Sequence, residues 1–100
     1  MKTLTNYEPR FDARKSFYWK AQEMDRENGD KILYSYWRPI LKIDKNDNLF
    51  LTWYYNRSQT TRRHALDFVL NYKKNYKRGG HNTADFLRVN ACGMIDADKI

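Results

Sequence analysis

The sequence is poor in the residues that build disulfides and metal centres. Cys92 is the single cysteine among 100 residues, which excludes an intrachain disulfide and a multi-thiolate metal site. The two histidines, His64 and His81, lack the spacing of a metal-ligand pair, and the carboxylates are scattered. We therefore expect no metal and no cofactor, and we interpret Cys92 as a small core residue rather than a nucleophile.

Long apolar runs are also missing. No stretch approaches the ~20 apolar residues of a membrane-spanning helix, and the first nine residues lack the apolar centre of a signal peptide. The paired glycines Gly79 and Gly80 follow a predicted helix, so they lack the strand–loop–helix context of a phosphate-binding loop. These absences predict a cytoplasmic protein that does not contact a membrane.

The sequence does contain positive charge, and most of it lies in one segment. The net charge is +7. Between residues 61 and 80, six Lys or Arg stand against one acid, Asp67, whereas residues 1–60 hold eleven basic and eight acidic side chains. An excess gathered on one element indicates a polyanionic partner.

Aromatic residues are the second abundant class, at 16% of the chain with eight Tyr and three Trp. Aromatic side chains bury a large area each and suit β-sheets, so we expect them mainly in the core of a β-rich fold. A surface on which nucleic-acid bases stack is the alternative interpretation.

The hydrophobic pattern predicts four strands between about residues 15 and 55. Phe17, Trp19 and Ala21 alternate with polar neighbours, and Asn28-Gly29 supplies a hairpin turn. A short helix over residues 12–24 is the competing interpretation, because several residues there favour helices. The remaining strand-like stretches cover residues 31–37, 40–44 and 49–55, with a turn at 45–48.

A helical period follows the strands and predicts a helix over residues 59–77. Ser58, Thr60 and Thr61 can cap its first turn, and the glycine pair ends it. A short capped helix is predicted over residues 83–90. The apolar face of the long helix consists of Ala65, Phe68, Val69, Tyr72 and Tyr76.

These elements predict one domain of the α+β class. We expect a four-stranded antiparallel β-meander packed by one amphipathic helix, with a short C-terminal helix. Residues 1–13 show no period and are interpreted as an extended arm, residues 14–90 as the domain, and residues 91–100 as a C-terminal tail without a clear pattern.

Six basic side chains lie off the apolar face of the predicted helix and form the candidate nucleic-acid or anion-binding site. Phosphate contacts from such side chains supply affinity rather than sequence choice. A solvated charged face is the alternative. The six residues are Arg62, Arg63, Lys73, Lys74, Lys77 and Arg78.

His64 is the one candidate for acid–base catalysis. A small basic domain with His, Arg and Tyr could cleave RNA, as compact ribonuclease toxins do. No second titratable group is placed by its spacing to pair with His64, so we expect a protein that is not an enzyme. Asp67 is predicted to pair with Arg63, one turn earlier, on the solvated surface.

Three stretches match motifs of a known group of proteins: Lys15–Ala21 (KSFYWKA), Leu33–Tyr36 (LYSY) and Ser58–Ala65 (SQTTRRHA). On these motifs the chain resembles short proteins encoded by bacteriophages, plasmids and integrative elements of Gram-positive bacteria. Members of that group carry KSFYGKA, a Tyr-Ser-Tyr-Asx-Thr strand and a helix entry of the form YSxTTxRHI. This chain therefore has Trp19 in place of a glycine and Trp37-Arg38-Pro39 in place of the Asx-Thr stretch.

The resemblance implies an origin in a phage or mobile element, and small proteins of such elements often act against host defences, for example as anti-CRISPR inhibitors. Our leading hypothesis is a non-enzymatic protein in the cytoplasm of a bacterial host. It would bind RNA or DNA, or a host nucleoprotein effector such as a CRISPR nuclease. The alternatives are a small basic ribonuclease toxin and a structural accessory protein without a nucleic-acid ligand. The oligomeric state stays open. The motif residues that the resemblance singles out are Ser58, Thr60, Thr61, Arg63 and His64.

Overall fold

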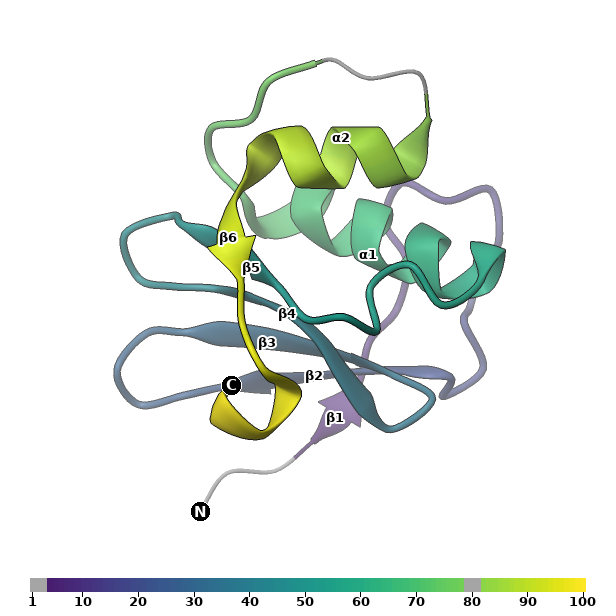
Figure 1. Cartoon of the computed structure of the whole chain (residues 1–100). Helices are drawn as coiled ribbons and strands as arrows, with labels where there is room; N and C mark the ends of the chain where they lie inside the picture. The colour runs from purple at the N-terminus through teal and green to yellow at the C-terminus, as the bar shows by residue number, and fades with distance from the viewer. Residues whose placement is uncertain (1–3, 79–81) are drawn as a thin grey trace.

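A six-stranded sheet forms the centre of the protein in the computed structural model, which describes residues 4–78 and 82–100 (Figure 1). The strands lie side by side in the order of the sequence. Neighbouring pairs from β1 to β5 are antiparallel, and β5 pairs with β6 in parallel. The strands are β1 (Thr5–Asn6), β2 (Ala21–Asp25), β3 (Lys31–Ser35), β4 (Arg38–Ile43), β5 (Leu49–Leu51) and β6 (Ala91–Met94).

Two helices accompany the sheet. α1 (Gln59–Tyr72) lies against β3 and β4, and α2 (Thr83–Asn90) packs on α1 and leads directly into β6 (Figure 1). A short 3-10 helix (Ala97–Lys99) follows near the C-terminus. The α+β class and the helix over residues 83–90 are confirmed.

The predicted sheet has four antiparallel strands, whereas the sheet in the structure has six strands and includes one parallel pair. β2 to β5 do form an antiparallel meander, but β1 and β6 extend it to a mixed sheet of six strands. A parallel neighbour needs a long crossover connection, and α1 and α2 provide it between β5 and β6. Residues 91–94 carry no strand pattern of their own, so this pairing depends on tertiary packing.

The first predicted strand starts later than its alternating pattern indicates. Tyr18 and Trp19 have positive φ angles of 54° and 66°, and the Lys20 amide donates to the Phe17 carbonyl at 3.0 Å. These residues therefore form a tight turn, and β2 begins only at Ala21. Phe17 is buried, whereas Trp19 points to solvent, which breaks the predicted register.

The long helix ends at Tyr72 rather than at residue 77. Asp47, in the turn between β4 and β5, accepts hydrogen bonds from the amides of Lys74 and Asn75, each at 2.9 Å. The Lys73 ammonium pairs with the same carboxylate at 3.1 Å. Because Asp47 takes these amides, the chain leaves the helix there. Gly79 and Gly80, predicted to end the helix, lie outside the described residues.

The core lies between the sheet and α1. Ala65, Phe68 and Val69 of the predicted apolar face are fully buried. They pack with apolar side chains of β3, β4 and β5. Tyr76 lies beyond the helix and makes an edge-to-face contact with Phe86 of α2. The sheet contributes Leu33, Ile40, Leu41, Ile43, Leu49 and Leu51 to this core.

The N-terminal segment is held to α1 by a buried carboxylate. Asp67 is 2% exposed and accepts hydrogen bonds from the Tyr7 hydroxyl at 2.6 Å and from the amides of Arg10, Phe11 and Asp12 at 2.7–2.9 Å. The prediction that Asp67 pairs with Arg63 on the surface is wrong, because the N-terminal segment covers it. Burial, with a further contribution from Asp67, raises the pKa of Tyr7.

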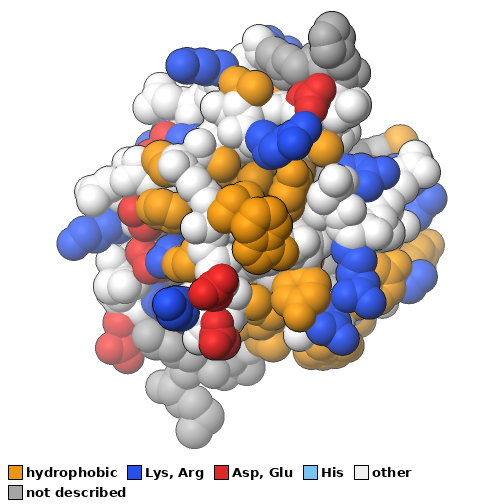
Figure 2. Space-filling model, viewed as in Figure 1, with side chains coloured by type: hydrophobic (Ala, Val, Ile, Leu, Met, Phe, Trp, Pro, Cys, Tyr) orange, Lys and Arg blue, Asp and Glu red, His pale blue; other side chains and the backbone are white. Residues whose placement is uncertain are grey.

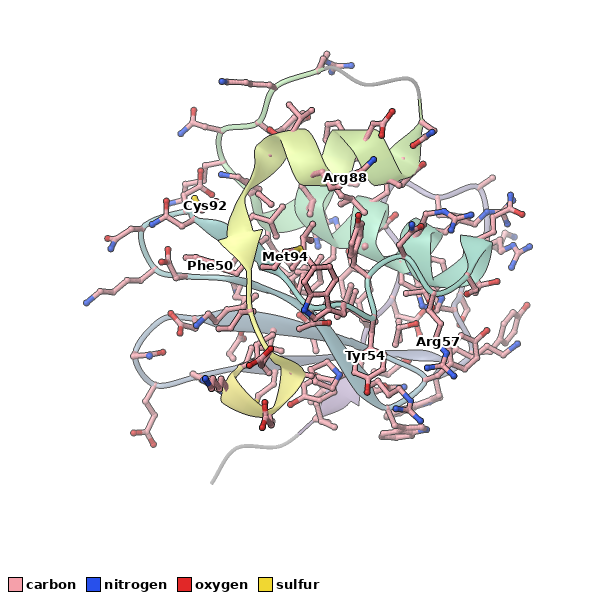
Figure 3. The ribbon with its side chains drawn as sticks, in the orientation of Figure 1. Phe50, Tyr54, Arg57, Arg88, Cys92 and Met94 are labelled. Carbon is pink, nitrogen blue, oxygen red and sulfur yellow. The ribbon has the colours of Figure 1, made fainter. Side chains whose placement is uncertain are left out.

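The C-terminal segment is also part of the fold. It supplies β6 and the buried side chain of Ile100. Cys92 lies on β6 and is exposed, with its thiol 3.5 Å from the Asn48 side-chain oxygen (Figure 3). The interpretation of Cys92 as a core residue is therefore wrong.

Replacing Asp67 by Asn tests the carboxylate clamp. An amide oxygen accepts fewer and weaker hydrogen bonds, so we expect Asp67→Asn to lower the free energy of unfolding by about 3 kcal/mol in urea denaturation. Asp96→Asn is the control, because Asp96 and its partner Lys99 are exposed. Its effect should stay within about 0.5 kcal/mol. Equal effects of the two substitutions would contradict the assignment.

Candidate nucleic-acid interface

A polar cluster, buried except for the half-buried Ser58, joins β3 to the start of α1. The Ser35 hydroxyl lies 2.8 Å from His64 Nδ1 and 3.3 Å from the Thr61 hydroxyl. The Ser58 side chain caps α1 by accepting from the Thr61 amide at 3.1 Å, and its hydroxyl donates to Thr61 Oγ1 at 3.1 Å. We name Ser35, Ser58, Thr61 and His64 the serine–histidine cluster.

His64 is enclosed by aromatic rings. It is 1% exposed, its ring centroid lies 4.4 Å from that of Phe17, and the Tyr36 ring is 6.1 Å away. Burial lowers the pKa of His64 to about 4, so the imidazole is neutral at physiological pH. An enclosed imidazole has no access to a substrate, so the ribonuclease hypothesis loses its candidate catalytic base.

The three motif stretches meet at this cluster. Phe17 comes from the first stretch, Ser35 and Tyr36 from the second, and His64 from the third. The remaining motif residues lie at its edges. Thr60 lines a cavity beside Tyr36, and Arg63 lines a different cavity beside Asp67. The motifs thus define a structural junction between the sheet and the helix.

Two tight turns emerge from this junction, at Tyr18-Trp19 and at Tyr36-Trp37. Tyr36 and Trp37 have φ angles of 51° and 68° and join β3 to β4 as a two-residue hairpin loop. Both turns therefore carry positive φ at both central residues, a pattern of type I′ turns, which prefer Asn-Gly. We name them the aromatic turns.

The aromatic turns are fixed to each other by hydrogen bonds. The Tyr36 amide donates to the Lys20 carbonyl at 2.7 Å. The buried side chain of Gln22 accepts from the Trp37 amide at 3.3 Å and donates to the Trp19 carbonyl. One glutamine amide thus holds both turns side by side.

All four side chains of the aromatic turns are exposed. The exposed fractions are 76% for Tyr18, 56% for Trp19, 46% for Tyr36 and 62% for Trp37. Positive φ costs a residue with a Cβ about 1 kcal/mol or more. Exposed aromatic rings gain little burial energy to offset this cost, so packing in the core does not explain the arrangement.

Basic side chains accompany these rings. Lys20 and Arg38 directly follow the two tryptophans, and neither forms an ion pair within residues 4–78 and 82–100. Figure 2 shows Lys and Arg side chains interleaved with hydrophobic ones along the right-hand edge of the molecule, near the region where Figure 3 labels Tyr54 and Arg57.

The six predicted basic site residues are not brought together. Arg62 and Arg63 lie in the first turns of α1, and Arg62 donates to the Asn56 side chain at 2.8 Å. Lys73 to Arg78 follow the other end of this 14-residue helix, about 20 Å away. Lys73 is mostly buried in its pair with Asp47, while Lys74, Lys77 and Arg78 are exposed.

The aromatic turns differ from the prediction from sequence, in which their residues belong to strands. A signal was present: Tyr-Trp followed by a basic residue occurs at residues 18–20 and again at 36–38. Trp19 and Trp37 also stand where the resembling group has glycine and Asx, two residue types that tolerate positive φ.

Within the described residues, no group of His, Cys, Asp and Glu side chains is arranged to hold a metal ion. No helix of this part of the chain is long and apolar enough to cross a membrane.

The buried His64 predicts a dependence of stability on pH. Its folded pKa, about 4, lies below its unfolded value of 6.5, so the unfolded chain binds the proton first as pH falls. The contribution of neutral His64 to stability is therefore fully present above pH 6.5 and is lost progressively as the pH falls toward 4. We expect a loss of about 2 kcal/mol between pH 7.5 and pH 5 in urea titrations. His64→Gln should flatten this slope, and an unchanged slope in that variant would contradict the assignment.

The positive φ angles predict that two tryptophans cost stability. We expect the double substitution Trp19→Gly, Trp37→Asn to raise the free energy of unfolding by about 1–2 kcal/mol, because both new residues tolerate this conformation. Trp53→Gly is the matched control. Trp53 is 73% exposed but is not among the residues with positive φ, so glycine there should lower stability. A destabilised double variant in urea denaturation would contradict the strain argument.

Comparison with known protein families gives a match, and it includes this junction. Residues 5–85 match a family of unknown function, DUF8033, and this range contains the aromatic turns and the serine–histidine cluster. Comparison with curated proteins and with solved structures gives no match. Because the match covers most of the chain, the protein belongs to the DUF8033 family of unknown function.

Proposed function

We propose that this protein binds single-stranded nucleic acid through the aromatic turns. The observation that carries the proposal is the set of four exposed rings held at positive φ by a shared network of hydrogen bonds. Bases of a single strand are free to stack on such rings, whereas bases of a duplex already stack on each other. Each stacked base contributes ~1–3 kcal/mol to binding.

Charge around the rings supports the same ligand. Lys20 and Arg38 adjoin the two tryptophans, and Arg57 lies against the Tyr54 ring nearby. Cationic side chains beside stacking rings can contact the phosphates that link the stacked bases. We therefore propose that the nucleic-acid site is formed by the aromatic turns rather than by the basic helix.

Hydrogen bonds within the protein fix the backbone of both turns. Gln22 is fully buried and bonds to both turns, and the Tyr36 ring contacts the buried His64 ring. A surface ordered in advance loses little conformational entropy on binding. This supports recognition by stacking on a fixed platform rather than by folding around the strand.

An origin in a phage or mobile element, and a role against host defences, remain part of the proposal. A nucleoprotein effector such as a CRISPR nuclease exposes single-stranded guide or displaced strand, which is the ligand class that the aromatic turns suit. The protein would act by binding and without catalysis.

Fluorescence anisotropy with labelled single-stranded DNA and RNA tests the proposal at two salt concentrations. We expect Trp19→Ala and Trp37→Ala each to weaken binding about 5- to 150-fold, the equivalent of ~1–3 kcal/mol per stacked base. Affinity should fall with salt with a slope near −0.7 per contacted phosphate.

Trp53→Ala is the matched control, because Trp53 is an equally exposed tryptophan that lines a hollow with Asp98 rather than with basic groups. It should bind as the wild type does. Equal losses for all three tryptophans would overturn the assignment to the aromatic turns. If wild type binds no oligonucleotide at low salt, free nucleic acid is not the ligand. Inhibition of guide-loaded effector cleavage by wild type but not by the Trp19 and Trp37 variants would then assign the site to a nucleoprotein.

A further inference from the structure

We propose that the cavity beside the Tyr36-Trp37 turn binds the phosphate monoester of a nucleotide. The inference rests on the proposed function, because this cavity would hold the phosphorylated end of a strand whose bases stack on the aromatic turns. The cavity has a volume of about 450 Å³ and lies between this turn and the start of α1. Its wall includes Tyr36, Arg38, Tyr54, Arg57, Ser58 and Thr60.

The Tyr54 ring contacts two guanidinium groups that line this cavity. The Arg38 and Arg57 guanidinium carbons lie 5.1 and 5.9 Å from the Tyr54 ring centroid. Arg38 also donates to the Tyr54 hydroxyl at 3.2 Å. Figure 3 shows Tyr54 and Arg57 near each other on the segment that joins β5 to α1. The ring therefore holds both cations in place while leaving most of their N–H groups available.

Neither cation is neutralised by an acidic partner among the described residues. Arg38 and Arg57 form no ion pair with any residue in the described part of the chain, and no acidic residue lines the cavity. Two unpaired positive charges match the two negative charges of a phosphate monoester. Guanidinium groups bind phosphate with paired, charge-assisted hydrogen bonds.

Hydroxyl groups complete the polar wall. Ser58 and Thr61 are engaged in the cap of α1, whereas the Thr60 hydroxyl has no hydrogen-bond partner among the described residues. No acidic side chain occurs in the first turn of α1, so its field also favours an anion. These groups add to the cavity and the two arginines, on which the inference stands.

The size of the cavity favours a nucleotide over inorganic phosphate. A volume of about 450 Å³ exceeds what one phosphate fills and falls within the range of small-molecule sites. Tyr36 belongs both to the wall of the cavity and to the aromatic turns, so a sugar and base attached to the phosphate would meet an exposed ring. The same chemistry is offered by the end of a strand and by a free mononucleotide.

The test compares oligonucleotides of one sequence that carry a hydroxyl at both ends, a phosphate at the 5′ end or a phosphate at the 3′ end. We expect one terminal phosphate to tighten binding about 10-fold or more, the effect of new hydrogen bonds to charged groups. A mononucleotide with a phosphate at the same position should compete. Equal affinity for all three oligonucleotides, with no binding of the mononucleotide, would overturn the inference and leave the proposed function standing.

Two double variants with the same change in net charge locate the effect. Arg38→Gln, Arg57→Gln should abolish the preference for the terminal phosphate, measured as the ratio of the affinities for the phosphorylated strand and for the strand with two hydroxyl ends. Lys74→Gln, Lys77→Gln should keep the preference, because these exposed lysines lie beyond the other end of α1. Loss of the preference in both variants would show a general charge effect and overturn the inference.

Binding of a mononucleotide measured by calorimetry separates the two proposals. If no oligonucleotide binds but a mononucleotide does, and Arg38→Gln, Arg57→Gln abolishes that binding, the cavity is a nucleotide site and the strand-binding function fails. If neither ligand binds, both fail. Unfolding curves in urea confirm that each variant is folded before its affinity is compared.

Discussion

The hydrogen bond between the Ser35 hydroxyl and His64 Nδ1 is the contact on which the rest of the site depends. At 2.8 Å and fully buried, it fixes the end of β3 to the first turns of α1. Phe17 and Tyr36 pack on the same imidazole, so both aromatic turns start from one rigid point. Burial keeps the ring neutral, which allows a polar pair to lie in the core without an uncompensated charge.

The contacts that stabilise the fold are separate from the exposed aromatic turns. Asp67 and the serine–histidine cluster use buried polar groups to hold the N-terminal segment, the sheet and α1 together. Trp19 and Trp37 do not contribute to this packing. They occupy backbone positions better suited to glycine and asparagine, and their side chains are exposed to solvent. Strain of this kind persists only where surrounding contacts determine the conformation, and such positions concentrate at functional sites.

Much of the fold could be predicted from the sequence, because it rests on local patterns. The 3.6-residue period of Ala65, Phe68 and Val69, the Ser58 cap and the strands of the meander are readable from short windows. The end of α1 at Tyr72, the strand β6 and the burial of Asp67 depend on contacts between residues 26 or more positions apart in the sequence, so no local pattern shows them. The aromatic turns were missed for a related reason: strand-forming residue types occupy positions where the hydrogen bonds of Gln22 impose a turn.

The central claim, that the aromatic turns bind single-stranded nucleic acid, is tested most directly by the three indole N–H signals in an NMR titration. The chain has three tryptophans, and each gives one such signal: Trp19 and Trp37 in the aromatic turns, and Trp53 outside them. Addition of a short single-stranded oligonucleotide should shift the signals of Trp19 and Trp37 and leave that of Trp53 in place. Equal shifts of all three, or a shift of Trp53 alone, would contradict the account.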